Sequence, residues 1–175
     1  MTQDFRQALD LARDQGRTLR FWLRDDDAIR PGPALTRLMA LCADCGIPPT
    51  LAVIPAHASA NLAAALSHST RVALHGWAHE NHAGPAEKKQ ELGAHRPREL
   101  VLAELARGLE RLRALFPDHL IDLLVPPWNR IAPEVIAGLP GIGIRALSAY
   151  GKVSATELPL LNPEIDPIDW QIENL

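Results

Sequence analysis

Short apolar runs alternate along this chain with segments of helical periodicity. The runs at residues 50–54 and 120–125 are almost wholly apolar, as expected for strands that are buried on both faces. Strands of this kind, separated by helices, form parallel sheets through right-handed crossovers. The alternation therefore predicts an α/β fold, and it fits a (β/α) barrel and an open doubly wound sheet equally well.

The spacing of apolar residues and the positions of glycine and proline predict the individual elements. Helices are expected at residues 4–15, 33–44, 61–67, 98–116 and 132–138. Strands are expected at residues 18–24, 50–54, 70–74, 120–125 and 143–147, with 158–165 as a further candidate. No internal repeat or linker interrupts the 175 residues, so they are expected to form a single domain, 1–175.

Composition and charge argue against several classes of function. The net charge of -3 gives no basic footprint, which argues against a nucleic acid or an anionic membrane as partner. No segment approaches the roughly 20 apolar residues that span a bilayer. The amino terminus lacks the basic start and apolar core of a signal peptide, so a cytoplasmic location is expected.

Polar side chains that can bind a metal or build a site follow three of the expected strands. The acidic run 25–27 follows the first strand, His75 and His79 follow the third, and the Pro-Pro-Trp-Asn run 126–129 follows the fourth. Because the carboxyl ends of parallel strands meet at one edge of a sheet, these side chains are expected to converge there. One carboxylate with two histidines is a common ligand set of a catalytic metal, and it leaves positions open for water and substrate.

Each run also has a simpler interpretation. Three consecutive aspartates repel one another unless a cation or hydrogen bonds offset the repulsion, but aspartates are also common in solvated loops and helix caps. His75 and His79 are four residues apart, so one helical turn would bring both rings to one ion. The metalloprotease motif H-E-x-x-H is disfavoured, because its glutamate is absent.

Two tryptophan-containing runs complete the pattern. After Pro126 and Pro127, the first backbone N–H belongs to Trp128, and it can donate a hydrogen bond to a developing oxyanion. The simpler interpretation is that the two prolines only stiffen the chain where it leaves the strand. Near the carboxyl end, Trp170 stands beside acidic residues, as in many sugar-binding pockets, although simple surface charge explains the same run.

In this order, the runs resemble the motifs of polysaccharide deacetylases of the NodB-homology type, carbohydrate esterase family four. The acidic run matches the family's T-F-D-D-G motif in either of two registers. One makes Asp26 the general base and Asp27 the metal ligand, and the other gives these roles to Asp25 and Asp26. His75 and His79 match H-[S/T]-x-x-H, with Gly76 in place of the hydroxyl residue.

The third and fourth motifs match to different degrees. Val125 stands where the family's R-P-P-Y/F/W motif has the arginine that orients the base, and Arg24 and Arg130 are candidates to replace it. The D-x-x-D-W motif matches residues 166–170 fully. The resemblance extends from about residue 18 to residue 170. It implies a distorted (β/α) barrel that uses a divalent ion, Zn²⁺ in the first instance, to remove acetyl groups from amide- or ester-acylated sugars.

The resemblance also implies roles for individual residues. Asp27, His75 and His79 are expected to hold the ion, Asp26 to take a proton from the attacking water, and the Trp128 amide to stabilise the oxyanion. Further contacts to the substrate are expected from Trp77, Pro127, Asn129, Asp166, Asp169 and Trp170.

One part of the family pattern has no match. The family's last motif carries a histidine that protonates the leaving amine, but no histidine follows His119 in this sequence. The barrel is therefore expected to be incomplete at its carboxyl end. Either copies of the chain associate through the open sheet edge, or the tail 158–175 lies across it. Two other functions stay open, a weakly active or inactive domain that binds a sugar or a partner, and an amidohydrolase for a small non-sugar amide.

Overall fold

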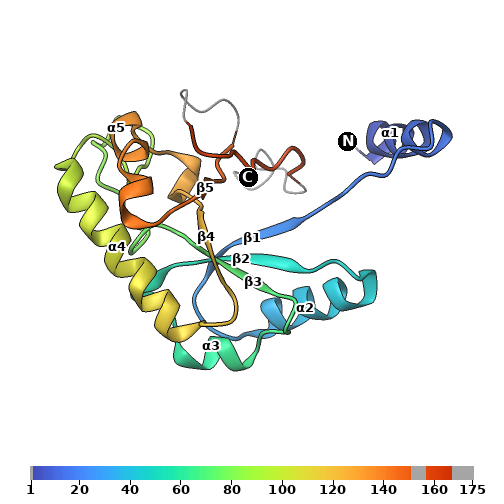
Figure 1. Ribbon diagram of the computed structural model, residues 1–175, viewed down its shortest axis with the longest axis horizontal. Helices are drawn as coiled ribbons and strands as arrows, with labels where there is room; N and C mark the ends of the chain where they lie inside the picture. Colours follow the sequence, from blue (N-terminus) through green and yellow to red (C-terminus); the bar gives the residue numbers. More distant parts are fainter. Residues whose placement is uncertain (1, 151–156, 167–175) are drawn as a thin grey trace.

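The expected parallel sheet is present in the computed structural model, which describes residues 2–150 and 157–166. Five parallel strands are arranged in the order β1-β2-β3-β4-β5 (Figure 1). Their bounds are Leu23–Ala28, Pro49–Val53, Arg71–Leu74, Leu120–Leu124 and Ala146–Leu147. The order of the strands in the sheet is the same as their order along the chain. This is typical of a barrel, because in a doubly wound sheet the strand order reverses at one point. The fold is thus the incomplete barrel implied by the resemblance.

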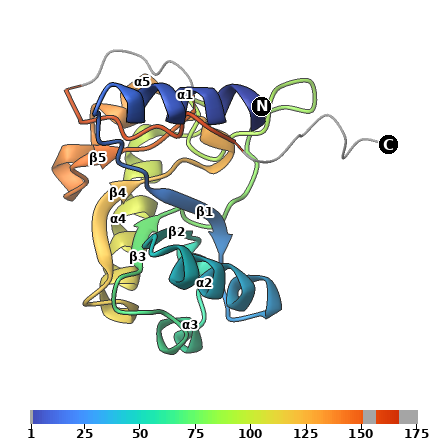
Figure 2. The ribbon, with the colours of Figure 1, turned by 90° about the vertical axis from the view of Figure 1, so that its right-hand side faces the viewer.

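The helices agree with their predicted positions to within a few residues. They are α1 (Thr2–Asp14), α2 (Pro33–Cys45), α3 (Ala60–Ala64), α4 (Arg98–Leu115) and α5 (Pro133–Ile136). α2 and α3 lie together near one end of the molecule, and α5 lies near the other (Figures 1 and 2). No helix in the described part of the chain combines the length and the apolar character that crossing a membrane requires.

Every strand presents two faces because successive side chains point to opposite sides. On one face, Leu51 and Leu74 belong to the main core, which also contains Leu105 and Leu112 of α4. On the other face, small apolar residues form a second cluster, which contains Ala52, Ala73, Leu123 and Val125. Since the helices cover the first face, the second face is the interior of the barrel.

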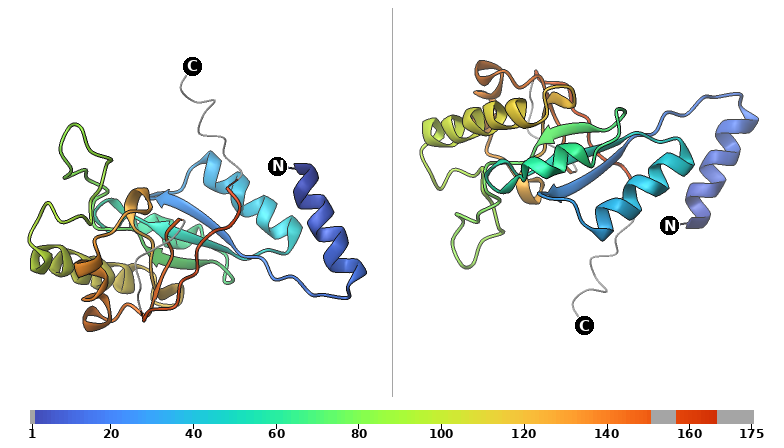
Figure 3. Two further views of the ribbon diagram at one scale, coloured as in Figure 1. Left: turned by 90° about the horizontal axis from the view of Figure 1, so that it is seen from above. Right: turned by 90° about the horizontal axis from the view of Figure 1, so that it is seen from below.

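The first strand and the last candidate strand were predicted wrongly. β1 begins at Leu23, not at residue 18, and it runs through the acidic run itself. The apolar residues expected in the strand, Leu19, Phe21 and Trp22, are 39–53% exposed and link the body to α1, which stands apart from it (Figures 1 and 3). The strand was predicted too early because these apolar residues were assumed to be buried. At the other end, residues 158–165 form only one isolated bridge, between Leu147 and Leu160.

The described part of the tail lies beside β5. The Leu147 N–H donates to the Pro159 carbonyl at 3.0 Å, and the Leu161 N–H donates to the Leu147 carbonyl at 2.9 Å. The Ser148 hydroxyl adds a bond of 2.6 Å to the Leu161 carbonyl. The chain thus covers the edge of β5 with its own tail, one of the two outcomes expected for an open edge. Association between copies stays a prediction.

Candidate metal centre

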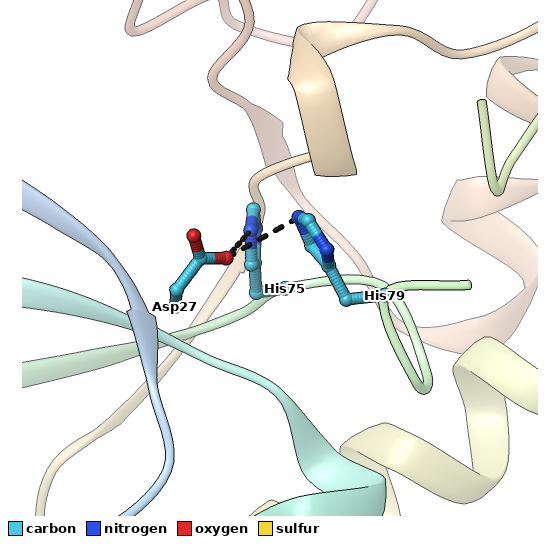
Figure 4. A group of neighbouring side chains, drawn as sticks. All are labelled: Asp27, His75 and His79. Atoms are coloured by element: carbon cyan, nitrogen blue, oxygen red, sulfur yellow. Dashed lines mark hydrogen bonds and ion pairs between the residues drawn. The ribbon is translucent and has the colours of Figure 1, made fainter. Parts of the chain in front are cut away.

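The ends of β1 and β3 bring three potential ligands together. The Asp27 Oδ1 atom lies 3.1 Å from His75 Nε2 and 3.2 Å from His79 Nε2 (Figure 4). All three potential ligand atoms lie within 4.8 Å of one another. Two imidazole nitrogens and one carboxylate oxygen are an ordinary donor set for Zn²⁺, so the residues fit a divalent ion.

His75 owes its place to the alternation of β3. Residues 71, 73 and 75 point to the barrel interior, and the His75 ring there is 2% exposed. Its Nδ1 atom lies 2.9 Å from the Val125 carbonyl oxygen. Because a carbonyl can only accept, Nδ1–H is the donor, and Nε2 is left as the nitrogen available to a metal.

His79 reaches the same point by a different route, and the expected helical turn is wrong. Residues 75–79 form a loop in which Gly76 has a φ of 60° and His79 a φ of 59°. The two rings lie 5.1 Å apart between centroids, with an interplanar angle of 35°. On its other side, the His79 ring lies 4.2 Å from the ring of Trp128 in the 3₁₀ turn Pro127–Asn129.

Backbone conformation marks the same place independently. Among the described residues, the non-glycine residues with positive φ are Asp27 (67°), His79 (59°), Trp128 (53°) and Asn129 (55°). Each such conformation costs free energy, and residues of this kind cluster where the surrounding structure holds a functional site in shape. All four belong to the metal centre or to the turn beside it.

The surroundings favour the protonation states that a metal requires. The hydrogen bond from His75 is the main cause that lowers the pKa of Asp27, and the charges of both histidines add to it. Burial lowers the pKa of His79, although the charges of Asp27 and Glu91 oppose this effect. An ionised carboxylate and a neutral His79 ring can bind a metal directly, whereas a proton shared between His75 Nε2 and Asp27 would be displaced by the ion.

Arg24 holds Asp26 in place. The guanidinium Nη2 donates to Asp26 Oδ2 at 2.9 Å, and Nε lies 2.9 Å from Oδ1. Nη2 also donates to Asn129 Oδ1, and Nη1 donates to the Ser148 hydroxyl at 2.8 Å. Of the two candidates for the missing motif arginine, Arg24 therefore meets the carboxylate, whereas Arg130 donates to the carbonyl of Lys89.

Asp25 does not join this group. It alternates with Arg24 and Asp26 along β1, so its side chain points to the other face of the sheet. There, burial raises its pKa, and the charges of Asp26 and Asp27 raise it further. Of the two registers that the sequence allowed, the geometry favours the one with Asp26 as base and Asp27 as ligand.

The residues expected to contact substrate are engaged with the protein in several cases. The Arg107 guanidinium of α4 lies 3.8 Å from the Trp77 ring centroid and covers one face of that ring. Pro127 is buried, and its Cγ atom lies 2.6 Å from where a Cβ on Gly76 would stand. Asp166 belongs to the tail segment that follows β5. Asp169 and Trp170 lie outside the described residues.

Sequence reasoning missed Glu91. Its carboxylate is 1% exposed and accepts hydrogen bonds from the backbone N–H groups of residues 77–79. Nothing in its immediate sequence distinguishes it from the other acids of a polar segment. The only signal was the length of that segment, 76–97, since long connections in compact domains are often functional.

No family model and no curated protein matches the sequence, but the fold matches solved structures. One is a family 4 carbohydrate esterase from Streptomyces lividans (15% identity, 74% of this chain, 62% of that chain, TM-score 0.58). A second is IcaB from Ammonifex degensii (17% identity, 73% of this chain, 58% of that chain, TM-score 0.59). A third is a de-N-acetylase from Aggregatibacter actinomycetemcomitans (12% identity, 89% of this chain, 74% of that chain, TM-score 0.62). The chain thus has the fold of these structures, and it spans about three fifths of the length of the first two.

Proposed function

We propose that this protein is a metal-dependent hydrolase that removes acyl groups, acetyl in the first instance, from a sugar. The observation that carries this proposal is the convergence of Asp27, His75 and His79 beside a carboxylate, Asp26, that an arginine holds in place. The likeness of the fold to that of a family 4 carbohydrate esterase and a de-N-acetylase supports the class of reaction.

Asp27, His75 and His79 would hold the ion, and Zn²⁺ suits a site with two imidazole ligands. A divalent ion bound there would lower the pKa of a water molecule and polarise an acyl carbonyl. The chain contributes the orientation of its ligands. The Val125 carbonyl fixes the ring of His75, and the ring of Trp128 limits the rotation of His79.

Asp26 is the group we assign as general base. Each of its carboxylate oxygens meets one nitrogen of Arg24, so the carboxylate has one orientation. A carboxylate offers about four lone pairs, so two such contacts leave room for a proton from the attacking water. Its position next to Asp27 in the chain keeps the base close to the ligand group.

The first experiment tests the ion. Protein purified without chelators should contain one divalent ion per chain by elemental analysis, and the His75→Ala/His79→Ala variant should contain none. Full occupancy in the double variant would overturn the assignment of the ligands.

The second experiment tests the reaction through the leaving group. No residue is assigned here to protonate a leaving amine, and loss of a general acid typically lowers the rate by about 10²–10⁴-fold. Esters depart with less need for a proton, so acetate should be released faster from an O-acetylated than from an N-acetylated sugar oligomer. Ion binding without acetate release from either substrate would favour the second candidate, a domain that binds a sugar without turnover.

A further inference from the structure

We propose that Glu91 is a positioning residue of the metal centre, which fixes the loop that carries His79. This inference rests on the proposed function, because it assumes that the Asp27–His75–His79 group binds an ion. It concerns a carboxylate outside the ligand group, on a segment that no sequence motif covers.

The contacts of Glu91 converge on the His79 loop. Its Oε1 atom accepts from the N–H groups of Ala78 at 2.8 Å, His79 at 3.1 Å and Trp77 at 3.3 Å. Three consecutive backbone donors directed at one anion form a nest, an arrangement that fixes the backbone conformation of the residues involved. His79, with its positive φ, is one of the three.

Gly76 provides the space that this carboxylate occupies. A Cβ atom on residue 76 would stand 1.9 Å from Glu91 Oε2, well inside van der Waals contact. The φ of 60° at Gly76 also favours glycine, since other residues rarely adopt it. The glycine and the glutamate, which are separated in the sequence, therefore fit each other in the structure.

The segment around Glu91 is itself anchored on two sides. The Leu92 carbonyl accepts from the Ala132 N–H at 2.9 Å, which ties the segment to the chain after the Trp128 turn. Arg96 donates to the Glu91 carbonyl and forms an ion pair of 2.9 Å with Glu104 on α4. The segment that carries Glu91 thus contacts both the His79 loop and the chain that follows the Trp128 turn.

A role as a fourth ligand is not favoured, because backbone donors already occupy the carboxylate. The competing explanation is a purely structural one, in which Glu91 stabilises the fold but leaves the geometry of the metal centre unchanged. The two explanations differ in one measurable quantity, the affinity of the folded protein for a metal ion.

The experiment measures Zn²⁺ affinity by competition with a chelator, together with thermal unfolding of the metal-free protein. Glu91→Ala should bind Zn²⁺ about 10–100-fold more weakly than the parent, as is typical when an outer partner of a ligand is lost. Glu91→Gln should recover most of the affinity, because its amide oxygen can still accept from residues 78 and 79. Glu87→Ala is the matched control, since Glu87 belongs to the same loop but caps Gly84 instead.

A double-mutant cycle tests directly whether Gly76 and Glu91 fit each other, and its Gly76→Ala variant, which keeps the carboxylate, is the second variant if Glu91→Ala folds poorly. Gly76→Ala should weaken Zn²⁺ binding in the parent, and should do so less in a Glu91→Gly background, where the contact with Glu91 Oε2 is removed and the contact with Pro127 Cγ, at 2.6 Å, is unchanged. The backbone strain of alanine at position 76 is the same in both backgrounds and cancels. Additive effects in this cycle would overturn the proposed fit between the two residues.

The remaining outcomes separate the two proposals. A parent protein that binds no divalent ion overturns the proposed function and this inference together. A parent that binds Zn²⁺, with Glu91→Ala equally tight and merely less stable, overturns only the positioning role.

Discussion

His75 and His79 belong to one candidate metal centre, but different parts of the molecule hold them. His75 follows the alternation of a buried strand, and its ring is fixed by a carbonyl of the neighbouring strand exit. His79 lies in a loop with positive φ values and depends on Glu91 and Trp128 for its position. A strand thus places a side chain by its regular geometry, whereas a loop needs dedicated contacts to do the same.

The largest expected effect is the loss of either ligand, and it tests this contrast directly. His75→Ala and His79→Ala should both lose Zn²⁺ binding, but they should differ in the stability of the metal-free protein. His75→Ala leaves a buried gap and an unpaired carbonyl, so it should lower the free energy of unfolding by about 2–3 kcal/mol. His79→Ala loses mainly a ring contact, so about 1 kcal/mol is expected. Urea unfolding in the presence of a chelator measures both changes in the free energy of unfolding. Equal losses would contradict the difference between the strand-placed and the loop-placed histidine.

The next effect concerns the strand-borne side of the centre. Arg24→Ala removes a buried guanidinium that contacts Asp26, Asn129 and Ser148. It should lower the free energy of unfolding by about 2 kcal/mol, less than for a fully buried pair because Asp26 is partly exposed. Arg24→Lys should recover little of this loss, since an ammonium cannot reproduce the two-point contact. Full recovery by lysine would show that charge alone matters.

A smaller effect on metal affinity separates the two aspartates. Asp26→Asn should keep the bound ion and lose acetate release, because Asp26 is the proposed base and not a ligand. Asp27→Asn should weaken both. If Asp25→Asn and Asp26→Asn were instead the damaging pair, the register of the acidic run would be the alternative one.

The smallest expected effect is the dependence on pH. Because burial lowers the pKa of His79, its ring stays neutral below the ordinary histidine value of about 6.5. Zn²⁺ affinity should therefore persist somewhat below pH 6.5 before protons compete. In the metal-free protein, stability should fall as the pH drops from about 6.5 towards the lower folded-state pKa of His79, since the unfolded chain takes up the proton first. Chelator competition and urea unfolding between about pH 5 and 7.5 would measure both, and a stability that rose on acidification would contradict the assigned shift.

The contrast between strand and loop also explains which features could be predicted from the sequence. The strands that precede His75 and Val125 were predicted, and for the second the reason was a nearly continuous apolar run, which is typical of a buried parallel strand. The acidic run was assigned to the right edge of the sheet, but β1 itself was placed too early. Leu19, Phe21 and Trp22 are apolar yet exposed, and residue type alone does not distinguish an exposed apolar run from a buried one.

The contacts that hold the loops were not predictable in the same way. Glu91 accepts hydrogen bonds from backbone N–H groups. Nearly every residue has such a group, so the sequence does not show which residues are its partners. Arg24 and Arg130 were equal candidates to meet Asp26 while the acidic run was placed after the strand. Because β1 includes that run, Arg24 and Asp26 lie two positions apart on one face of the strand. The Glu91 contacts depend on how a segment 12–14 positions away folds back onto the His79 loop, whereas the Arg24 contact depends only on where β1 begins and ends.

The reach of Arg24 has a consequence for the order in which the protein becomes functional. Its bond to Ser148 joins residues 124 positions apart. A ribosome makes Arg24 and the proposed base early, but Ser148, which completes the arginine's contacts, emerges 124 residues after Arg24. Contacts of such long sequence separation form late, because closing the intervening chain costs entropy that only the rest of the fold repays. The arginine beside the proposed base should therefore complete its contacts late in folding, after Asp27 and His75, which are 48 positions apart, have met.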